Sequence, residues 1–526
     1  MKLYKTLIFI FALLAVLAGI SLVFPEEGIQ IGSLHLNFPS LREVLSFTSS
    51  EEEEHELTPE ELLAKEMEVL MQAQDSTFLD FCQNSPIRIS MPRVHRYETD
   101  TLTQAQYLEM SDSLRLTFDS ITSYVDSTAV LTASAAPDTM WVTHRDVLTD
   151  ERDLTYLDDL FLSLDSARSH HVRIIHYGDS QIEEDRITSG LREHFQEMFG
   201  GGGCGMMPAQ KWVAKLTAFQ STSPELPYYV AYGTTTMHAK SNSYGPMATV
   251  AHAAGNVKIT YSMVKNDKFT HVRDFDRVSV LRNNPDGSGL QYLVQEFDTM
   301  QQKVTVNVAG PADIYGVLLD QKTGVSMDNV PMRGSSGNIF TRIARNTLEP
   351  FFEHENVRLI ILQYGGNSVP GLRNEESLVN FCKDIQRQIR LFNEIAPDAK
   401  ILFIGPSDMS TNVGGQMKTY AHLPHFVELL DEYVTAAGAS FWNLYSAMGG
   451  ENSMVQWVAA RPQLAGEDYV HFTHKGAEHV SDLLFETIDT YYKYYKFRRG
   501  ELELELPVAN EDSLAAAADS LPVAAE

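Results

Sequence analysis

Three side chains in this 526-residue sequence have the types and spacing of a hydrolytic site. Ser180 follows Gly178 and Asp179 directly after an apolar run, so we expect it at a strand-to-helix turn, where a tight backbone exposes a serine hydroxyl. Asp468 precedes His471 by three residues. A carboxylate at that spacing can fix the tautomer of the imidazole, so that the other ring nitrogen can take a serine proton. Together they predict a nucleophile, its base and an orienting acid.

Each of these residues also has a simpler interpretation. Ser180 could cap an ordinary helix, because Ser and Asp are preferred at that position. Asp468 could cap a helix beside a surface histidine, or His471 could form a metal pair with His474. The metal pair is the weaker alternative, because the sequence places no third ligand beside it and contains no HExxH motif.

Two turns offer donors for an oxyanion. Gly337 closes the run Gly-Ser-Ser-Gly, and it presents a backbone amide with no side chain to crowd a carbonyl oxygen. Asn367 closes the run Gly-Gly-Asn, and its side-chain amide is a neutral donor suited to a developing negative charge. Each turn alone could be structural. After successive strands of one sheet, the two turns would face the same site.

Several other residues near these motifs are candidates for the lining of the site. Asp179 precedes the serine and Asp408 follows a predicted strand, with capping and turn roles as the alternative for both. Tyr364, Trp442 and Trp457 could stack on sugar rings, and a place in the core or at the rim is the default interpretation for each.

A parallel α/β sheet would position these residues at one edge. Five apolar runs are each followed by Gly, Ser, Pro or Asn and then by a helical stretch such as Glu183–Phe199 or Glu375–Ile395, which is typical of α/β folds. The predicted strands are His171–Tyr177, Gly324–Val330, Val357–Gln363, Lys400–Ile404 and Ser440–Tyr445. Ligands bind beyond the carboxyl ends of such strands.

The stretch 205–320 has an all-β character. Alternating or β-rich runs broken by Asn, Asp and Gly predict short strands. The expected strands are Asn256–Val264, Asp276–Leu281, Leu290–Phe297, Gln302–Val308 and Ile314–Leu319. We therefore expect a β-sandwich inserted between two parts of the α/β domain, 146–204 and 321–497, where it would help to select the substrate.

Four blocks in this order resemble the SGNH (GDSL-type) hydrolase superfamily. The blocks are Gly178–Ser180 (GDS), Gly334–Gly337 (GSSG), Gly365–Asn367 (GGN) and Asp468–His471 (DYVH). The resemblance covers about 146–204 and 321–497, and the set of four is far more specific than any single block. It implies a flavodoxin-like three-layer α/β/α fold and a Ser-His-Asp esterase mechanism, for which we expect no cofactor and no metal.

The resemblance also implies a role for each site residue. Ser180 would be the nucleophile and, through its amide, an oxyanion donor. Gly337 and Asn367 would be the other donors. His471 would be the general base, and Asp468 would orient it.

The sequence departs from the family pattern at two positions. Gln181 follows the GDS block where the family has an apolar residue, and Ser368 follows Asn367 where the family usually has aspartate. Neither departure removes a catalytic group.

The architecture also resembles bacterial peptidoglycan or polysaccharide O-acetylesterases with carbohydrate-binding-like insertions. This second resemblance rests on the domain order and on Gly200–Ala209, a glycine-rich stretch expected to be a flexible loop. The expected activity is removal of an O-acetyl group from a cell-envelope glycan. The alternatives are an O-acetyltransferase, a non-catalytic glycan-binding scaffold, and a metal-dependent deacetylase that uses His471 and His474.

The composition excludes several classes of protein. Asp and Glu number 70 against 41 Lys and Arg, a formal charge of −29 without a basic stripe, so we expect no nucleic-acid partner. Cys82, Cys204 and Cys382 are far apart and form no CxxC motif, which argues against a disulfide framework or a structural zinc site.

The ends of the chain set the expected compartment. Two lysines precede the uncharged apolar run Leu7–Phe24, so 1–26 is predicted to be a membrane anchor or signal segment with the rest of the chain outside the cytoplasm. We expect a catalytic domain in the bacterial periplasm, anchored to the inner membrane or released if the segment is cleaved. A spacer with helical pieces is expected over 27–145, and a disordered acidic tail over 498–526.

Overall fold

The computed structural model describes residues 29–31, 34–36, 88–103, 140–211, 214–283 and 289–501. The predicted anchor Leu7–Phe24, much of the predicted spacer and nearly all of the predicted tail lie outside them. Within the described residues, no helix is both long and apolar enough to cross a membrane. The chain divides into two units, Met1–Asp75 and Ser76–Glu526. In the first unit, β1 (Ile29–Ile31) and β2 (Leu34–Leu36) pair antiparallel.

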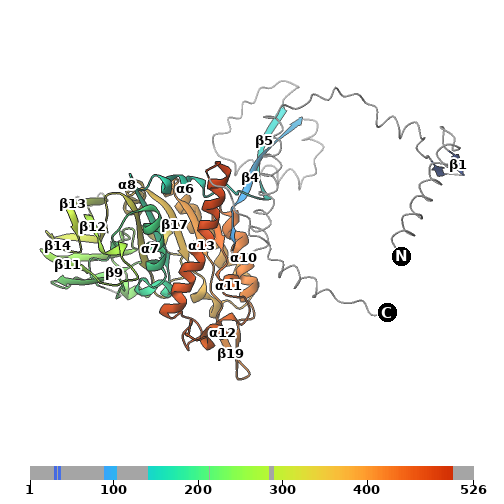
Figure 1. Cartoon of the computed structure of the whole chain (residues 1–526). Helices are drawn as coiled ribbons and strands as arrows, with labels where there is room; N and C mark the ends of the chain where they lie inside the picture. The colour runs from blue at the N-terminus through green and yellow to red at the C-terminus, as the bar shows by residue number, and fades with distance from the viewer. Residues whose placement is uncertain are drawn as a thin grey trace, which may run out of the picture. The chain divides into compact units, whose positions relative to one another are not determined.

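A six-stranded sheet forms the centre of the second unit (Figure 1). Its strands lie in the order β16, β6, β17, β18, β21 and β3. In that order they comprise Gly324–Pro331, His171–Gly178, Val357–Gln363, Lys400–Ile404, Ser440–Trp442 and Ile89–Ser90. The first five are parallel, and their order along the chain is 2-1-3-4-5, that of flavodoxin-like folds. The predicted α/β class is therefore confirmed.

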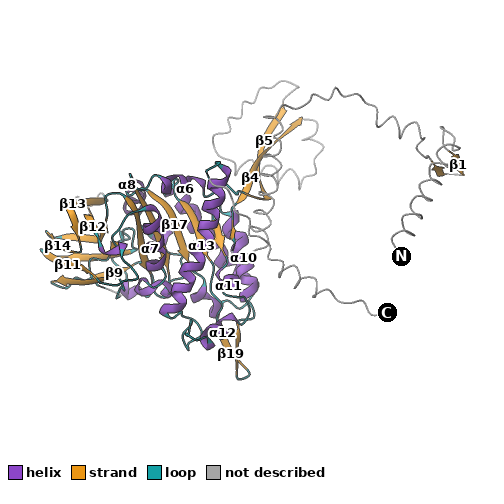
Figure 2. Cartoon of the chain, in the orientation of Figure 1, coloured by secondary structure: helices purple, strands orange, loops and turns teal. Residues whose placement is uncertain are grey.

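Helices cover both faces of this sheet (Figure 2). One face is covered by α6 (Asp158–Asp165), α7 (Thr188–Phe199) and α13 (His474–Arg498). The other is covered by α8 (Arg345–His354), α9 (Glu375–Ile395) and α10 (Leu423–Ala436). Successive strand residues point to opposite faces, so Ile174 joins the first apolar cluster and Ile175 the second. Helix α7 begins after the predicted Glu183, because Glu184 has the positive φ of 61°.

Shorter elements connect these layers. The 3-10 helices are η1 (Ser180–Asp185), η2 (Thr235–Met237), η3 (His271–Arg273), η4 (Phe340–Arg342) and η5 (Gly366–Gly371). Two short α-helices are α11 (Leu444–Ala447) and α12 (Ser453–Ala459). Two antiparallel pairs are β4 (Arg93–Thr103) with β5 (Met140–Arg152), and β19 (Ser410–Val413) with β20 (Gln416–Thr419).

The structure differs from the predicted sheet at its far edge. The last predicted strand ends early at Trp442, because the Asn443 side chain accepts the backbone N–H of Ser446 and begins α11. Beyond it, β3 pairs antiparallel with β21, although its residues lie within the predicted spacer. The Tyr491 hydroxyl of α13 fixes β3, because it accepts the N–H of Ile89 at 3.2 Å and donates to the Ile89 carbonyl at 2.8 Å.

Between β6 and β16, the described residues form nine strands in two antiparallel sheets. The larger sheet holds β7 (Gly205–Met207), β9 (Tyr228–Val230), β10 (Thr249–Ala253), β12 (Phe275–Asn283), β13 (Leu290–Gln301) and β15 (Ala312–Asp320). The smaller sheet holds β8 (Ala218–Ser223), β11 (Val257–Met263) and β14 (Lys303–Val308). Buried side chains of both sheets share one apolar cluster. That the sheets form a carbohydrate-binding β-sandwich stays a prediction. Gly200–Ala209 is not simply a loop, because it contains the buried strand β7.

A buried ionic network joins these sheets to the parallel sheet. The Arg173 guanidinium of β6 donates to Asp328 of β16 at 2.7 Å, to Asp320 of β15 at 2.5 Å and to Glu355 at 3.0 Å. Asp328 also accepts the backbone N–H of Met206 in β7 at 2.7 Å. All four charged side chains are almost fully buried, so removal of one partner would leave an uncompensated charge.

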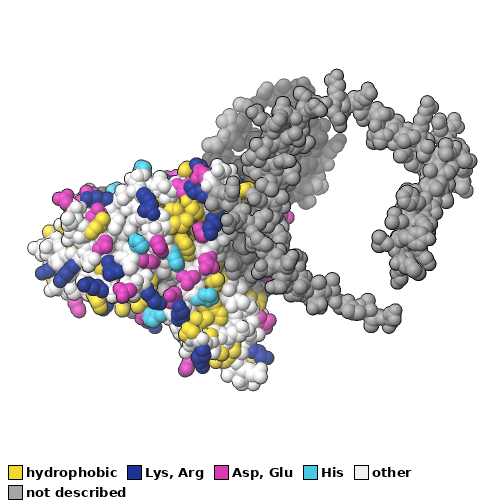
Figure 3. All heavy atoms as spheres, in the orientation of Figure 1, with side chains coloured by type: hydrophobic (Ala, Val, Ile, Leu, Met, Phe, Trp, Pro, Cys, Tyr) yellow, Lys and Arg dark blue, Asp and Glu magenta, His cyan; other side chains and the backbone are white. Residues whose placement is uncertain are grey.

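Acidic and basic side chains are interspersed on the face in view in Figure 3. Of the three cysteines, Cys204 and Cys382 are buried free thiols, and Cys82 lies outside the described residues.

Candidate active site

Strand β6 carries Ser180 to the carboxyl edge of the central sheet. The strand ends at Gly178, and Ser180 begins η1 two residues later. A methyl group on Gly178 would lie 3.0 Å from the Ile182 side chain and 3.2 Å from the Gln363 carbonyl oxygen. Close packing at the end of β6 therefore favours glycine before the serine turn.

A tight turn positions His471 just before α13. Asp468 Oδ1 accepts the backbone N–H groups of Val470 and His471, each at 3.0 Å. Tyr469 within this turn has a φ of 58°, a left-handed conformation that is costly for a residue with a side chain. The turn leaves the second carboxylate oxygen of Asp468 2.7 Å from Nδ1 of His471.

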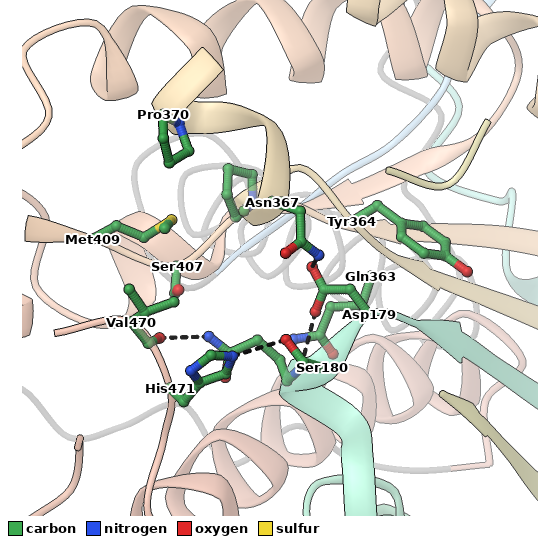
Figure 4. Close-up of a pocket in the computed structure, with 14 residues that line it drawn as sticks. Asp179, Ser180, Gln363, Tyr364, Asn367, Pro370, Ser407, Met409, Val470 and His471 are labelled. Carbon is green, nitrogen blue, oxygen red and sulfur yellow. Dashed lines mark hydrogen bonds between the residues drawn. The ribbon is translucent and has the colours of Figure 1, made fainter. Parts of the chain in front are cut away.

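The structure brings Ser180, His471 and Asp468 into one chain of hydrogen bonds, and Figure 4 draws the bond between Ser180 and His471. Oγ of Ser180 lies 2.8 Å from Nε2 of His471. Because the Asp468 carboxylate accepts the Nδ1 proton, Nε2 is the unprotonated nitrogen and can accept the serine proton. Transfer of that proton to His471 would make the Ser180 oxygen a nucleophile.

Hydrogen bonding keeps the Asp468 carboxyl group ionised. Burial alone would raise its pKa, but bonds from the side chain and backbone of His471 and from the Val470 amide hold the pKa below its ordinary value. The exposed fractions of the Asp468 and His471 side chains are 52% and 38%, so the pair lies at a solvent-facing rim.

A pocket of about 200 Å³ opens beside Ser180 and His471. Its lining comes from the turns after β6, β17 and β18 and from the His471 turn. The lining residues are Asp179, Ser180, Gln181, Gln363, Tyr364, Gly366, Asn367, Pro370, Gly405, Pro406, Ser407, Met409, Val470 and His471. Pockets for drug-sized ligands are larger, at about 300 to 1,000 Å³, so this one suits a small acyl group.

The two predicted oxyanion donors lie in different environments. Asn367 lines the pocket, and its side-chain N–H groups donate to Asp179 Oδ2 at 3.1 Å and to the Ser335 carbonyl at 3.2 Å. The Gly337 amide donates instead to the Ser335 hydroxyl at 3.1 Å, and Gly337 does not line the pocket. A methyl group on Gly337 would lie 2.6 Å from the Tyr364 ring, so close packing alone accounts for this glycine.

Asp408 does not line the site, so that prediction is wrong. Its carboxylate is fully buried and accepts the Thr419 hydroxyl at 2.8 Å and the Met454 amide at 2.8 Å. These partners lie 11 and 46 residues later in the chain, and the second lies in the first turn of α12. Asp408 therefore joins α12 to β20, while its neighbours Ser407 and Met409 line the pocket.

The aromatic candidates have core environments. Tyr364 lines the pocket, but its ring is buried and its hydroxyl donates to the Met332 sulfur at 3.4 Å (Figure 4). Trp442 and Trp457 belong to the apolar cluster on the α13 face. Tyr364 therefore lines the site as predicted, with its ring in the core, while Trp442 and Trp457 are core residues.

Gln181 is a site residue whose role was not predicted from the sequence, where it only departs from the family pattern. Its Nε2 donates to the Val470 carbonyl at 2.6 Å, and its Oε1 accepts the Phe472 N–H at 3.3 Å. Gln181 therefore binds the backbone on both sides of His471, directly beside the nucleophile. The sequence signal for this role was a polar residue at position 181, where the family that the chain resembles has an apolar residue.

We expect Gln181→Leu to lower kcat about tenfold with a smaller change in KM, because the loosened His471 turn misplaces the base. Steady-state kinetics with a chromogenic acetyl ester would measure this. Gln181→Glu retains the acceptor for Phe472 but places a carboxylate oxygen against the Val470 carbonyl, so its kcat should fall at least as far. A change in KM alone would contradict the positioning role.

The side chains around His471 do not form a metal site in the described part of the chain. His474 Nε2 lies 3.8 Å from Glu184, while His471 uses both ring nitrogens toward Ser180 and Asp468. Elsewhere in the described residues, the side chains of His171, Asp320 and Glu355 lie close enough together to hold a metal ion. Arg173 donates to the latter two and already supplies the positive charge.

Asp179 is a buried carboxyl group beside the nucleophile. Burial raises its pKa to about 6, and the Gln181 amide and the charge of His471 offset only part of that effect. Its side chain also orients Asn367, since Oδ2 accepts that amide at 3.1 Å.

This raised pKa predicts a pH-dependent stability. Between pH 4 and 6 the folded state keeps the Asp179 proton while the unfolded state releases it, so the free energy of unfolding falls by about 3 kcal/mol as the pH rises. Denaturant titrations at pH 4 and pH 7 should show that loss in the wild type and a smaller loss in Asp179→Asn. Equal losses would contradict the assignment.

Comparison with known proteins supports the fold. No family model matches the chain, and no curated protein matches it. A solved structure of a peptidoglycan O-acetylesterase matches with a TM-score of 0.54 and 18% identity, over 64% of this chain and 96% of that one. The two chains share a fold. At this identity the likeness shows the fold alone.

Weaker structural matches include two further proteins. The periplasmic domain of a lipopolysaccharide acetyltransferase from Salmonella ser. Paratyphi A matches with a TM-score of 0.22 and 14% identity, over 32% of this chain and 72% of that one. A family two carbohydrate esterase from Cellvibrio japonicus matches with a TM-score of 0.22 and 11% identity, over 53% and 99%. Both scores are below 0.5, so the shared fold rests on the first match alone.

Proposed function

We propose that this chain is a serine esterase of the SGNH type that removes O-acetyl groups from a cell-envelope glycan. The observation that carries the proposal is the chain of hydrogen bonds from Asp468 through His471 to Ser180 at the mouth of a small pocket. The fold shared with a peptidoglycan O-acetylesterase supports the choice of substrate.

The proposed reaction has two steps. The Ser180 hydroxyl gives its proton to His471 Nε2 and attacks the acetyl carbonyl carbon, and His471 then returns that proton to the departing sugar oxygen. This leaves an acetyl ester on Ser180. His471 next takes a proton from water as the water oxygen attacks the acetyl carbon, and it then gives that proton to the Ser180 oxygen. The product leaves as acetic acid, which ionises in solution to acetate.

Asn367 is the proposed side-chain donor to the oxyanion, together with the Ser180 amide. A developing negative charge would compete with Asp179 and Ser335 for the Asn367 N–H groups. We expect Asn367→Ala to lower kcat about 100-fold, the usual cost of losing one such donor. Ser407→Ala alters another pocket residue and should change kcat only slightly. Full turnover in Asn367→Ala would refute this role.

The direction of acetyl transfer is decided by what attacks the acetyl ester on Ser180. Incubation of the full-length chain with O-acetylated peptidoglycan should release free acetate at a rate that Ser180→Ala abolishes. An acetyl group that stays on Ser180 until a sugar acceptor is added would instead identify an O-acetyltransferase. No reaction in either assay would favour a non-catalytic glycan-binding protein.

We also propose that 1–26 anchors the chain in the inner membrane, with the catalytic domain in the periplasm. The uncharged run Leu7–Phe24 after two lysines supports this location. Recovery of the protein from the soluble periplasmic fraction with its N-terminus removed would contradict the anchor.

A further inference from the structure

The smaller sheet of the all-β segment has one buried and one outer face. Ile259 and Tyr261 of β11 are fully buried in the apolar cluster. Alternate residues of each strand point the other way. The outer face comprises Phe219, Ser221 and Ser223 of β8, Lys258, Thr260 and Ser262 of β11, and Lys303, Thr305 and Asn307 of β14. We call it the outer β11 face.

The pairing register sets these nine side chains in three rows, with strands about 5 Å apart and rows about 7 Å apart. The rows are Ser223–Lys258–Asn307, Ser221–Thr260–Thr305 and Phe219–Ser262–Lys303. The Thr260 and Thr305 hydroxyls are 2.9 Å apart and hydrogen-bonded. Figure 1 shows β11 and β14 at the end of the unit away from α11 and α12. None of the nine residues lines the catalytic pocket.

The charge of the outer β11 face differs from that of the chain. None of its nine side chains is acidic, although the chain carries a formal charge of −29. Lys258 and Lys303 stand in its two outer rows, and six of the remaining seven side chains offer a hydroxyl or an amide. The face is therefore complementary to a ligand that carries hydroxyl groups and negative charges.

Its two ends have different shapes. Beside the first row lies an open hollow of about 320 Å³, which is lined by Ser223, Asn256, Val257, Lys258, Asn307, Val308 and Ala309. At the opposite row, the Phe219 side chain is 67% exposed. An exposed aromatic ring offers a packing surface for the apolar face of a sugar ring.

We propose that the outer β11 face binds a polysaccharide that carries carboxylates. Lys258 in the hollow and Lys303 bind the acid groups, the amide and hydroxyl side chains bind sugar hydroxyls, and Phe219 packs on one ring. The choice of an envelope glycan rests on the proposed function. The face would hold the polymer while Ser180 acts on acetyl groups elsewhere along it.

The test uses full-length Ser180→Ala protein in detergent, so that the glycan is not altered. Co-sedimentation with peptidoglycan sacculi should yield a Kd at least tenfold weaker when Phe219→Ala, Lys258→Ala and Lys303→Ala are combined. Sacculi whose carboxyl groups have been amidated should bind the unaltered face more weakly than native sacculi. Leu162→Ala and Lys383→Ala change exposed residues on α6 and α9 and serve as matched controls.

Equal binding by the triple variant and the controls would overturn the proposal, as would equal binding to amidated and native sacculi. With Ser180 intact, the triple variant should hydrolyse a small chromogenic acetyl ester at the wild-type rate. Loss of that activity would also count against a separate binding face. Failure of the esterase proposal would appear independently, as activity that survives Ser180→Ala.

Discussion

Ser180→Ala should lower kcat for a short-chain chromogenic acetyl ester by at least about 10⁴-fold. The variant loses the hydroxyl oxygen that lies 2.8 Å from His471 Nε2 and forms the acetyl ester, so any residual rate must come from direct attack by water. Because the methyl side chain fits where the hydroxyl stood, the thermal stability should change little. Mass spectrometry of the wild type, quenched during turnover, should find an acetyl group on Ser180.

Two controls separate this chemistry from the metal alternative. His474→Ala removes the histidine that the metal hypothesis needs but leaves the Ser180–His471–Asp468 chain intact, so its turnover should equal that of the wild type. A chelator should likewise have no effect. Activity that survives Ser180→Ala but disappears in His474→Ala or with chelator would reverse the assignment.

Asp468→Asn should lower kcat about 10³-fold while the fold is preserved. The asparagine oxygen can still accept the Val470 and His471 amides, so the turn remains. Its NH₂ group, however, would face Nδ1 of His471 and favour the tautomer whose Nε2 carries the proton, which cannot accept one from Ser180. A buried aspartate in this role contributes about 10⁴-fold, and water at this half-exposed site should reduce the effect.

The pH dependence distinguishes this tautomer effect from a general loss of structure. In Asp468→Asn, kcat should recover partly as the pH rises, because hydroxide from the solvent can then take the serine proton in place of His471. A loss below about tenfold would mean that Asp468 merely shapes the turn. Asp468→Ala would then be the more damaging change, because it removes both backbone contacts.

The sequence predicted the central sheet well where strands are buried on both faces. Such strands appear as continuous apolar runs that end at glycine or a polar turn, and Val357–Gln363 and Lys400–Ile404 match the structure residue for residue. The strand Ile89–Ser90 was not predicted, because two residues are too few to show the alternation of apolar and polar side chains that marks a strand. The end of the last strand was wrong because Asn443 acts as a helix cap, and a short polar residue after an apolar run fits either role.

Long-range contacts limited the prediction of the site. The spacing within Asp468–His471 was informative because both residues lie on one turn. Neither the contact of Gln181 with the His471 turn nor the diversion of the Gly337 amide to Ser335 could be predicted, because each depends on where a distant or neighbouring side chain settles after folding. Asp408 was misplaced for the same reason, since its partners come from later elements.

The short strand β3 matters for where the folded domain begins. A chain shortened to the predicted start of the hydrolase, residue 146, would lack Ile89 and Ser90 and leave β21 as an open edge of the sheet. It would also leave the Tyr491 hydroxyl without its two backbone contacts. An uncovered edge strand can pair with the edge strand of another molecule. Ile89 and Ser90 occupy this edge, so a chain without them should be more prone to self-association.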